Sequence, residues 1–176
     1  ESTVAKSLFV AGTTWPGLMA WDDMRTIDFL CSRPEVDSQR LGAVGFGLGG
    51  FRAALLSALD ARIAATCVVG WMSTLDLMIE EAVTQHPWAA FIPGLRLGLD
   101  WPDIAALTMP RPLLVMQGSH DDHFPLEGYQ RSAEQLRAMY AKAGVPGNLD
   151  IGVYDVGHVF SREMQEHAWA FFAAQL

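Results

Sequence analysis

The six residues Gly45-Phe46-Gly47-Leu48-Gly49-Gly50 form the most informative segment of this chain. They end the short apolar run 40–46, which has the length and composition of a buried strand. They lead into 48–59, whose many alanines and leucines predict a helix. A glycine-rich turn between a strand and a helix is typical of two sites in α/β proteins, the phosphate loop of dinucleotide-binding folds and the nucleophile elbow of hydrolases.

The first interpretation uses Gly45, Gly47 and Gly50, which match the pattern G-x-G-x-x-G. Such glycines let the backbone approach a pyrophosphate at a helix N-terminus. The same fold also needs a carboxylate near the end of the next strand to hold a ribose. In this chain that strand ends at residues 68–71, which contain no acid, and the nearest downstream carboxylate is Asp76. The dinucleotide-binding interpretation therefore has only the glycines to support it.

The second interpretation is the nucleophile elbow, G-x-S-x-G. Its sharp turn needs small residues two positions before and two positions after the nucleophile. Gly45 and Gly49 occupy those positions, but Gly47 stands where the serine belongs. The six residues by themselves leave both interpretations open, so the choice depends on residues further along the chain.

The remaining pattern predicts an α/β domain that spans 1–176. Short apolar runs bounded by turn residues predict strands over 40–46, 63–70, 112–117 and 149–154. Helical patterns separate them over about 20–31, ended by Pro34, and over 48–59, 75–85, 129–143 and 162–175. Strands that alternate with helices favour a parallel sheet with right-handed crossovers. The proline-rich stretch 86–112 is either a cap over a site or a long connection.

Two later loops carry the residues that favour the elbow. Asp121 follows the strand 112–117, and His158 follows the strand 149–154. Elbow hydrolases place nucleophile, acid and histidine in this chain order, at the strand ends where open α/β sheets bind ligands. Either residue alone could be ordinary, because aspartates also cap turns and helices. Together, in this order and at these positions, they predict a catalytic pair.

Three further candidates for the site are aromatic or imidazole side chains: Trp71, His86 and Trp88. They are interpreted as walls of a substrate pocket, with core packing as an equal alternative. His120 and His123 flank Asp121, so a metal site is conceivable, but no further clustered ligand supports it. The sequence predicts no metal and no cofactor.

Composition excludes several classes of partner. The net charge is −8, and the 12 lysines and arginines are scattered, so no basic surface for nucleic acid or for anionic membranes is expected. No apolar run is long enough to span a bilayer. The two cysteines, Cys31 and Cys67, are expected to be reduced and packed, and a cytoplasmic location is predicted. The sequence begins with Glu1 and not with Met, so targeting signals could lie upstream.

Several motifs together resemble the dienelactone-hydrolase and acetyl-xylan-esterase-like branch of the α/β-hydrolases. They are residues 21–30 with 32–37 before the elbow, Gln117-Gly118-Ser119-x-Asp121, and 154–158 ending in His158. The resemblance covers nearly the whole chain and implies a serine hydrolase that acts on a small-molecule carboxylic ester. It implies that Asp121, and not the adjacent Asp122, is the acid and that His158 is the base. It also implies that the backbone N–H of Leu48 is one donor of the oxyanion hole.

The chain departs from that family in two ways. The serine position is Gly47, and the strands that the family places before the helix near Gly17 are not in this sequence. We therefore expect the C-terminal portion of the fold, whose exposed strand 40–46 is covered by a homodimer partner or by residues outside this sequence. The predicted function is that of an esterase, inactive or weakly active as written. The alternatives are a non-catalytic binding protein and a dinucleotide-binding domain.

Overall fold

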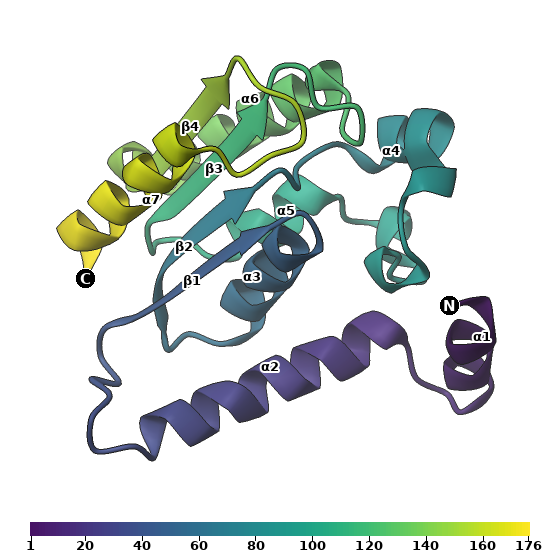
Figure 1. Ribbon diagram of the computed structural model, residues 1–176, viewed down its shortest axis with the longest axis horizontal. Helices are drawn as coiled ribbons and strands as arrows, with labels where there is room; N and C mark the ends of the chain where they lie inside the picture. The colour runs from purple at the N-terminus through teal and green to yellow at the C-terminus, as the bar shows by residue number, and fades with distance from the viewer.

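The computed structural model describes residues 1–176, except for the side chain of residue 81. Its centre is a four-stranded parallel sheet in the order β1-β2-β3-β4 (Figure 1). The strands are β1 (Leu41–Phe46), β2 (Ile63–Val69), β3 (Leu113–Gly118) and β4 (Leu149–Tyr154). The predicted α/β class, the four strands and their parallel arrangement are confirmed.

Helices connect consecutive strands, as the sequence predicts. Helices α3 (Leu48–Leu59) and α7 (Arg162–Gln175) match their predicted ranges, whereas α2 (Trp15–Cys31) ends as predicted but begins about five residues earlier than expected. Thr14 caps α2, because its hydroxyl accepts a hydrogen bond from the N–H of Gly17 at 3.1 Å. Among the described residues, no helix has both the length and the apolar character required to cross a bilayer.

Three other elements differ from expectation. Helix α1 (Ser2–Val10) has no counterpart in the sequence prediction, and only Ala5 of it is buried. Helix α4 (Leu75–Ala82) is shorter than predicted, because the chain tightens into the 3₁₀ turn η1 (Val83–Gln85). Helix α6 (Leu126–Lys142) begins three residues earlier than predicted, directly after Pro125.

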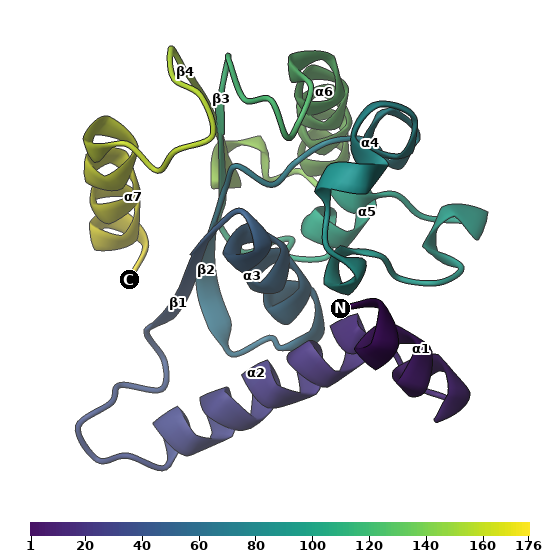
Figure 2. The same cartoon turned by 45° about the vertical axis from the view of Figure 1, so that its right-hand side comes forward.

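The sheet separates two apolar layers, as Figure 2 shows, with α7 on one face and α3, α5 and α6 on the other. On the α7 side, Cys67 and Met116 pack against Met164 and Phe172. On the opposite side, Val68 and Val115 pack against helical residues such as Phe51. Neighbouring residues of β2 and β3 thus point into different layers, and both strands are almost entirely buried.

The proline-rich stretch 86–112 forms a long connection that leads to β3, and its role as a cap over a site stays a prediction. Its second half contains η3 (Leu95–Leu97) and α5 (Trp101–Ala106), which belong to the main core. Trp101 is only 2% exposed and packs edge-on against Phe51. In its first half, η2 (Trp88–Ala90) buries Ala89 and Ala90 and leaves Trp88 exposed.

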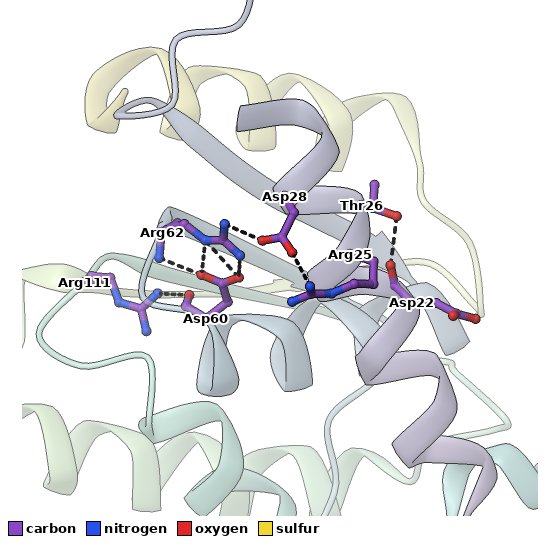
Figure 3. A network of polar contacts seen from close by, with 7 residues as sticks. All are labelled: Asp22, Arg25, Thr26, Asp28, Asp60, Arg62 and Arg111. Atoms are coloured by element: carbon purple, nitrogen blue, oxygen red, sulfur yellow. Dashed lines mark hydrogen bonds and ion pairs between the residues drawn. The ribbon is translucent and has the colours of Figure 1, made fainter. Parts of the chain in front are cut away.

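The two ends of the sheet carry different polar groups. At the amino end, Asp60 pairs with Arg62, which also reaches Asp28 of α2 (Figure 3). Arg111, just before β3, donates to the backbone carbonyls of Ser57, Asp60 and Ile63. These contacts tie α2, α3 and the loops before β2 and β3 together. The carboxyl end holds the turn after β1 and the loops after β3 and β4.

Strand β1 forms one edge of the sheet. Val44, in its middle, is 40% exposed, whereas the equivalent residues of β2 and β3 are fully buried. An apolar parallel strand with one unpaired side is normally covered. The exposed edge that the sequence predicts is therefore present.

Candidate active site

The turn after β1 has the sharp backbone expected of a nucleophile elbow. Gly47 has φ 56° and ψ −124°, a region that residues with side chains rarely adopt. The N–H of Gly47 donates to Val69 O at 2.9 Å, which fixes the turn to the neighbouring strand. A Cβ at Gly45 would lie 1.9 Å from the carbonyl oxygen of Gly49, so only glycine lets α3 pack this closely against β1.

His158 lies directly beside this turn. A Cβ built at Gly47 would be 3.3 Å from His158 Nε2, although the two residues are far apart in sequence. The loop after β4, yellow-green in Figure 1, runs beside the carboxyl end of β3 before it enters α7. The ring of His158 packs against Phe46 with centroids 4.5 Å apart, and its side chain is 21% exposed. The imidazole of His158 is therefore partly reachable from solvent.

Asp121 is bonded to the opposite nitrogen of the same ring. His158 Nδ1 lies 2.8 Å from Asp121 Oδ2, and the side chain of Asp121 is only 1% exposed. Gln117 Nε2 donates to the same oxygen at 2.7 Å, while the N–H groups of His123 and Phe124 donate to Oδ1. Several donors thus stabilise a buried carboxylate and fix its direction.

The adjacent Asp122 does not share this role. Its carboxylate is 85% exposed and pairs with His123 Nδ1 at 2.9 Å. That hydrogen bond lowers the pKa of Asp122 below its ordinary value. Of the two neighbouring aspartates, only Asp121 contacts His158 in this structure.

Leu48 is the first residue of α3, beside Gly47. N–H groups in the first turn of a helix have no acceptor within the helix, and the helix dipole makes this end favourable for negative charge. The N–H of Leu48 is therefore in a suitable element to stabilise an oxyanion that forms at position 47.

The three predicted pocket residues are not equivalent. His86 and Trp88 line one pocket of about 520 Å³. Trp71 is 3% exposed and lies behind His86, with ring centroids 5.7 Å apart. Trp71 also packs against Phe51, so its contacts are those of a core residue.

Sequence reasoning missed three side chains around His158. Gln117 was expected only as part of the motif that contains Asp121, yet its side-chain amide donates a hydrogen bond to the carboxylate of Asp121. His123 stacks on His158 with centroids 4.4 Å apart, and Phe46 contacts the same ring. Their positions next to the elbow and the acid were the only signal in the sequence that could have marked them.

One group of side chains could offer ligands to a metal ion. Ligand atoms of Asp121, His123 and His158 lie within 4.8 Å of one another. However, Nδ1 of His158 is bonded to Asp121, and Nδ1 of His123 is bonded to Asp122. A metal ion bound here would have to break the hydrogen bonds of His158 with Asp121 and of His123 with Asp122. The absence of a metal site stays a prediction.

Comparison with known proteins gives a consistent result. Residues 11–174 match the model of the dienelactone hydrolase family. YtaP of Bacillus subtilis (strain 168), provisionally named a hydrolase, is 31% identical over 147 residues, which are 82% of this chain and 48% of YtaP. The chain thus spans about half the length of this relative.

Solved structures share the same architecture. A carbohydrate esterase family 15 glucuronoyl esterase from Caldicellulosiruptor kristjansonii matches 89% of this chain and 49% of its own, with TM-score 0.74 and 21% identity. A Bacteroides fragilis protein, provisionally described as an acetyl xylan esterase, matches 86% of this chain and 40% of its own, with TM-score 0.72 and 22% identity. At these identities the likeness concerns the fold.

Proposed function

The chain belongs to the dienelactone hydrolase family and has the α/β-hydrolase fold, and from that premise we propose that its site is built to hydrolyse a small-molecule carboxylic ester. In this proposal His158 is the general base and Asp121 is the acid that orients it. Position 47 is the nucleophile position, and the N–H of Leu48 is one oxyanion donor. No cofactor takes part.

One observation carries the proposal. His158 has one nitrogen bonded to a buried carboxylate at 2.8 Å and the other 3.3 Å from the Cβ position of residue 47. A base held between an orienting acid and a strained elbow is the arrangement that activates a nucleophile in acyl transfer. The carboxylate fixes which nitrogen carries the proton, so the nitrogen that faces position 47 is left able to accept one.

Gly47 removes the hydroxyl on which the usual reaction depends. A serine would attack the ester carbonyl while His158 takes its proton, and His158 would then give that proton to the departing alcohol as the ester bond breaks. Water would later cleave the acyl-enzyme to release the acid and the free serine. Without that serine, His158 can only activate a water molecule directly. We expect turnover to be lower by roughly 10⁴-fold or more, by analogy with removal of a triad member.

The test is the substitution Gly47→Ser, assayed on p-nitrophenyl acetate. We expect it to raise turnover by roughly 10⁴-fold or more. The positive φ makes any side chain at position 47 strained, at about 1–3 kcal/mol of stability. Gly47→Ala is the matched control, because it adds the same Cβ and the same strain without a hydroxyl. It should stay inactive.

A non-catalytic role is the second candidate, and Gly47 itself is the observation that favours it. In that case the chain keeps the fold and the old site to bind a ligand or a partner. A folded but inert Gly47→Ser variant would favour this role over the esterase. The dinucleotide-binding interpretation is a weaker alternative, and titration with NAD and FAD tests it directly.

Three finer points belong to the same proposal. We propose that 1–176 acts as one domain and that a second copy covers the β1 edge, where Val44 is exposed. Light scattering tests this, because a stable monomer of 19.3 kDa would contradict it.

A cytoplasmic location agrees with two unpaired cysteines, of which the Cys67 thiol has its pKa raised to about 12 by burial.

A further inference from the structure

A largely apolar pocket lies between α1 and the turns that follow α4. It has a volume of about 520 Å³, within the range of small-molecule sites. Figures 1 and 2 both show α1 beside the chain segment that contains η2. Phe9 of α1 meets Trp88 of η2 edge-on, with ring centroids 6.5 Å apart. Two segments about eighty residues apart in sequence thus build one pocket.

The pocket exposes large apolar side chains at one place. Phe9, Val83 and Trp88 are each 43% exposed, and Phe91 and Ile92 complete the apolar wall. Single exposed apolar residues are normal on a protein surface, but a concave cluster of them marks a binding site. The aromatic rings favour a flat, π-bearing ligand, because aromatic pairs gain from edge-to-face or offset contacts.

One residue links this pocket to the proposed catalytic site. His86 lines the pocket, and its Nε2 lies 3.1 Å from the backbone oxygen of His123. The ring of His123 in turn stacks on the ring of His158, and the backbone N–H of His123 donates to Asp121. The pocket wall is therefore separated from the general base by a single residue.

The polar chemistry of that wall follows from the same contact. A carbonyl oxygen can only accept, so Nε2 of His86 carries the proton that it donates to His123. Burial lowers the pKa of His86, which favours the neutral ring at neutral pH. In that tautomer Nδ1 is an acceptor. The wall next to the catalytic loop is thus uncharged. Glu1 also lines the pocket and brings an acidic side chain, so the pocket does not favour an anionic ligand.

We propose that the pocket formed by Phe9, Val83, His86, Trp88, Phe91 and Ile92 binds an uncharged aromatic group, and that this group is part of the ester substrate. The second half of this inference rests on the proposed esterase function, whereas the first half does not. The aromatic group belongs either to the alcohol or to the acyl side of the ester, and in both cases the same flat ring occupies the pocket that Phe9 and Trp88 line.

The first experiment measures binding without catalysis. Titration of the native chain with 2-naphthol by calorimetry should show one site. Trp88→Ala should weaken that binding by about ten-fold, while Trp88→Phe should keep it within about three-fold. Trp169→Ala is the matched control, because Trp169 is an exposed tryptophan of α7 that does not line this pocket. It should leave binding unchanged.

The second experiment uses the Gly47→Ser variant with 2-naphthyl acetate and methyl 2-naphthoate. Trp88→Ala should raise KM by about ten-fold for the ester that places its ring in the pocket, whereas the control Trp169→Ala should leave that KM unchanged. The ester that responds identifies the aromatic side as alcohol or acyl.

The outcomes separate the two proposals. If Trp88→Ala is folded and binds 2-naphthol like the native chain, the pocket proposal is overturned. If 2-naphthol binds through Trp88 but Gly47→Ser cleaves no ester, the pocket stands and the esterase function fails. If Gly47→Ser is active while Trp88→Ala changes neither binding nor KM, the esterase stands and the pocket fails.

Discussion

Two aspartates at opposite ends of the sheet are equally buried, each 7% exposed, yet their partners differ in kind. Asp60, at the amino end, accepts hydrogen bonds from the side chain and the N–H of Arg62 (Figure 3). Asp121, at the carboxyl end, accepts from Gln117, His158 and two backbone N–H groups. Burial alone therefore does not mark a functional carboxylate.

The partner decides what each carboxylate can do. A guanidinium stays charged at every physiological pH, so the pair of Asp60 and Arg62 holds loops in place and cannot exchange protons. Arg62 lowers the pKa of Asp60, and Arg111 contributes in the same direction. An imidazole can take up and release a proton near neutral pH. The pair of Asp121 and His158 can therefore take part in proton transfer. The pair of Asp60 and Arg62 can only stabilise the fold.

The strongest way to test this contrast is to remove each carboxylate's charge in the Gly47→Ser background. We expect Asp121→Asn to lower turnover on p-nitrophenyl acetate by roughly 10³–10⁴-fold, because an amide neither fixes the tautomer of His158 nor stabilises its cation. Asp60→Asn, the same change at the other end, should leave turnover per folded molecule unchanged. Equal activities of the two variants would contradict the proposed role of Asp121.

The amino end should respond most strongly in stability. Arg111→Met removes the donor to three backbone carbonyls, those of Ser57, Asp60 and Ile63. Leaving such acceptors without partners should lower the free energy of unfolding by about 3 kcal/mol, and Tm by roughly 6–12 °C for a chain of this size.

Arg33→Met is the matched control for Arg111→Met. Arg33 is exposed and pairs with Glu35 at the surface, so its loss should change Tm little. A thermal melt followed by circular dichroism measures both variants. If Arg111→Met and Arg33→Met have the same Tm, the contacts of Arg111 do not stabilise the fold as proposed.

A smaller effect should depend on pH. The pKa of Asp60 is lowered from 3.8 in the folded chain, so the stability that it contributes is fully present above about pH 4. It is lost as pH falls through the lower, folded value. Asp60→Asn should therefore cost about 1–2 kcal/mol at pH 7, and the difference from native should shrink toward pH 3. Urea unfolding at pH 7, 5, 4 and 3 checks this, and a difference that stays constant with pH would argue against it.

The smallest effect is expected from an exposed pair on the rim of the site. His120 Nε2 lies 2.7 Å from Asp155 Oδ1, but these side chains are 69% and 93% exposed. Asp155→Asn should change stability by less than about 0.5 kcal/mol and the turnover of Gly47→Ser by less than about two-fold. A large loss of turnover would show that Asp155 is a second functional carboxylate besides Asp121.

Much of the fold could be predicted from local sequence. Strand β4 and helices α3 and α7 begin and end where their patterns predict, since long runs of consistent periodicity leave few alternatives. Helix α1 was not predicted, although Val4, Ala5, Leu8 and Phe9 recur at helical spacing. The first residue of α6 depends on how the loop after Asp121 folds, and the spacing of apolar residues in the sequence does not predict the conformation of a loop.

The candidate site was predictable in part for the same reason. Asp121 and His158 stood out because each follows a strand whose carboxyl end must lie at one edge of a parallel sheet. Trp71 and Trp88 looked alike in sequence, and the fold buries one and exposes the other. The pocket between Phe9 and Trp88 has no sequence signature, because its walls come from distant segments.

Short-range patterns were enough to predict where the four strands lie along the chain, the glycine turn around Gly47 and the loops that carry Asp121 and His158. Which side chains meet depends on how the whole chain folds. Backbone donors from His123 and Phe124 turn Asp121 inward to His158, while Asp122 points to solvent. Such choices depend on burial and on hydrogen bonds between loops, and no local pattern encodes them.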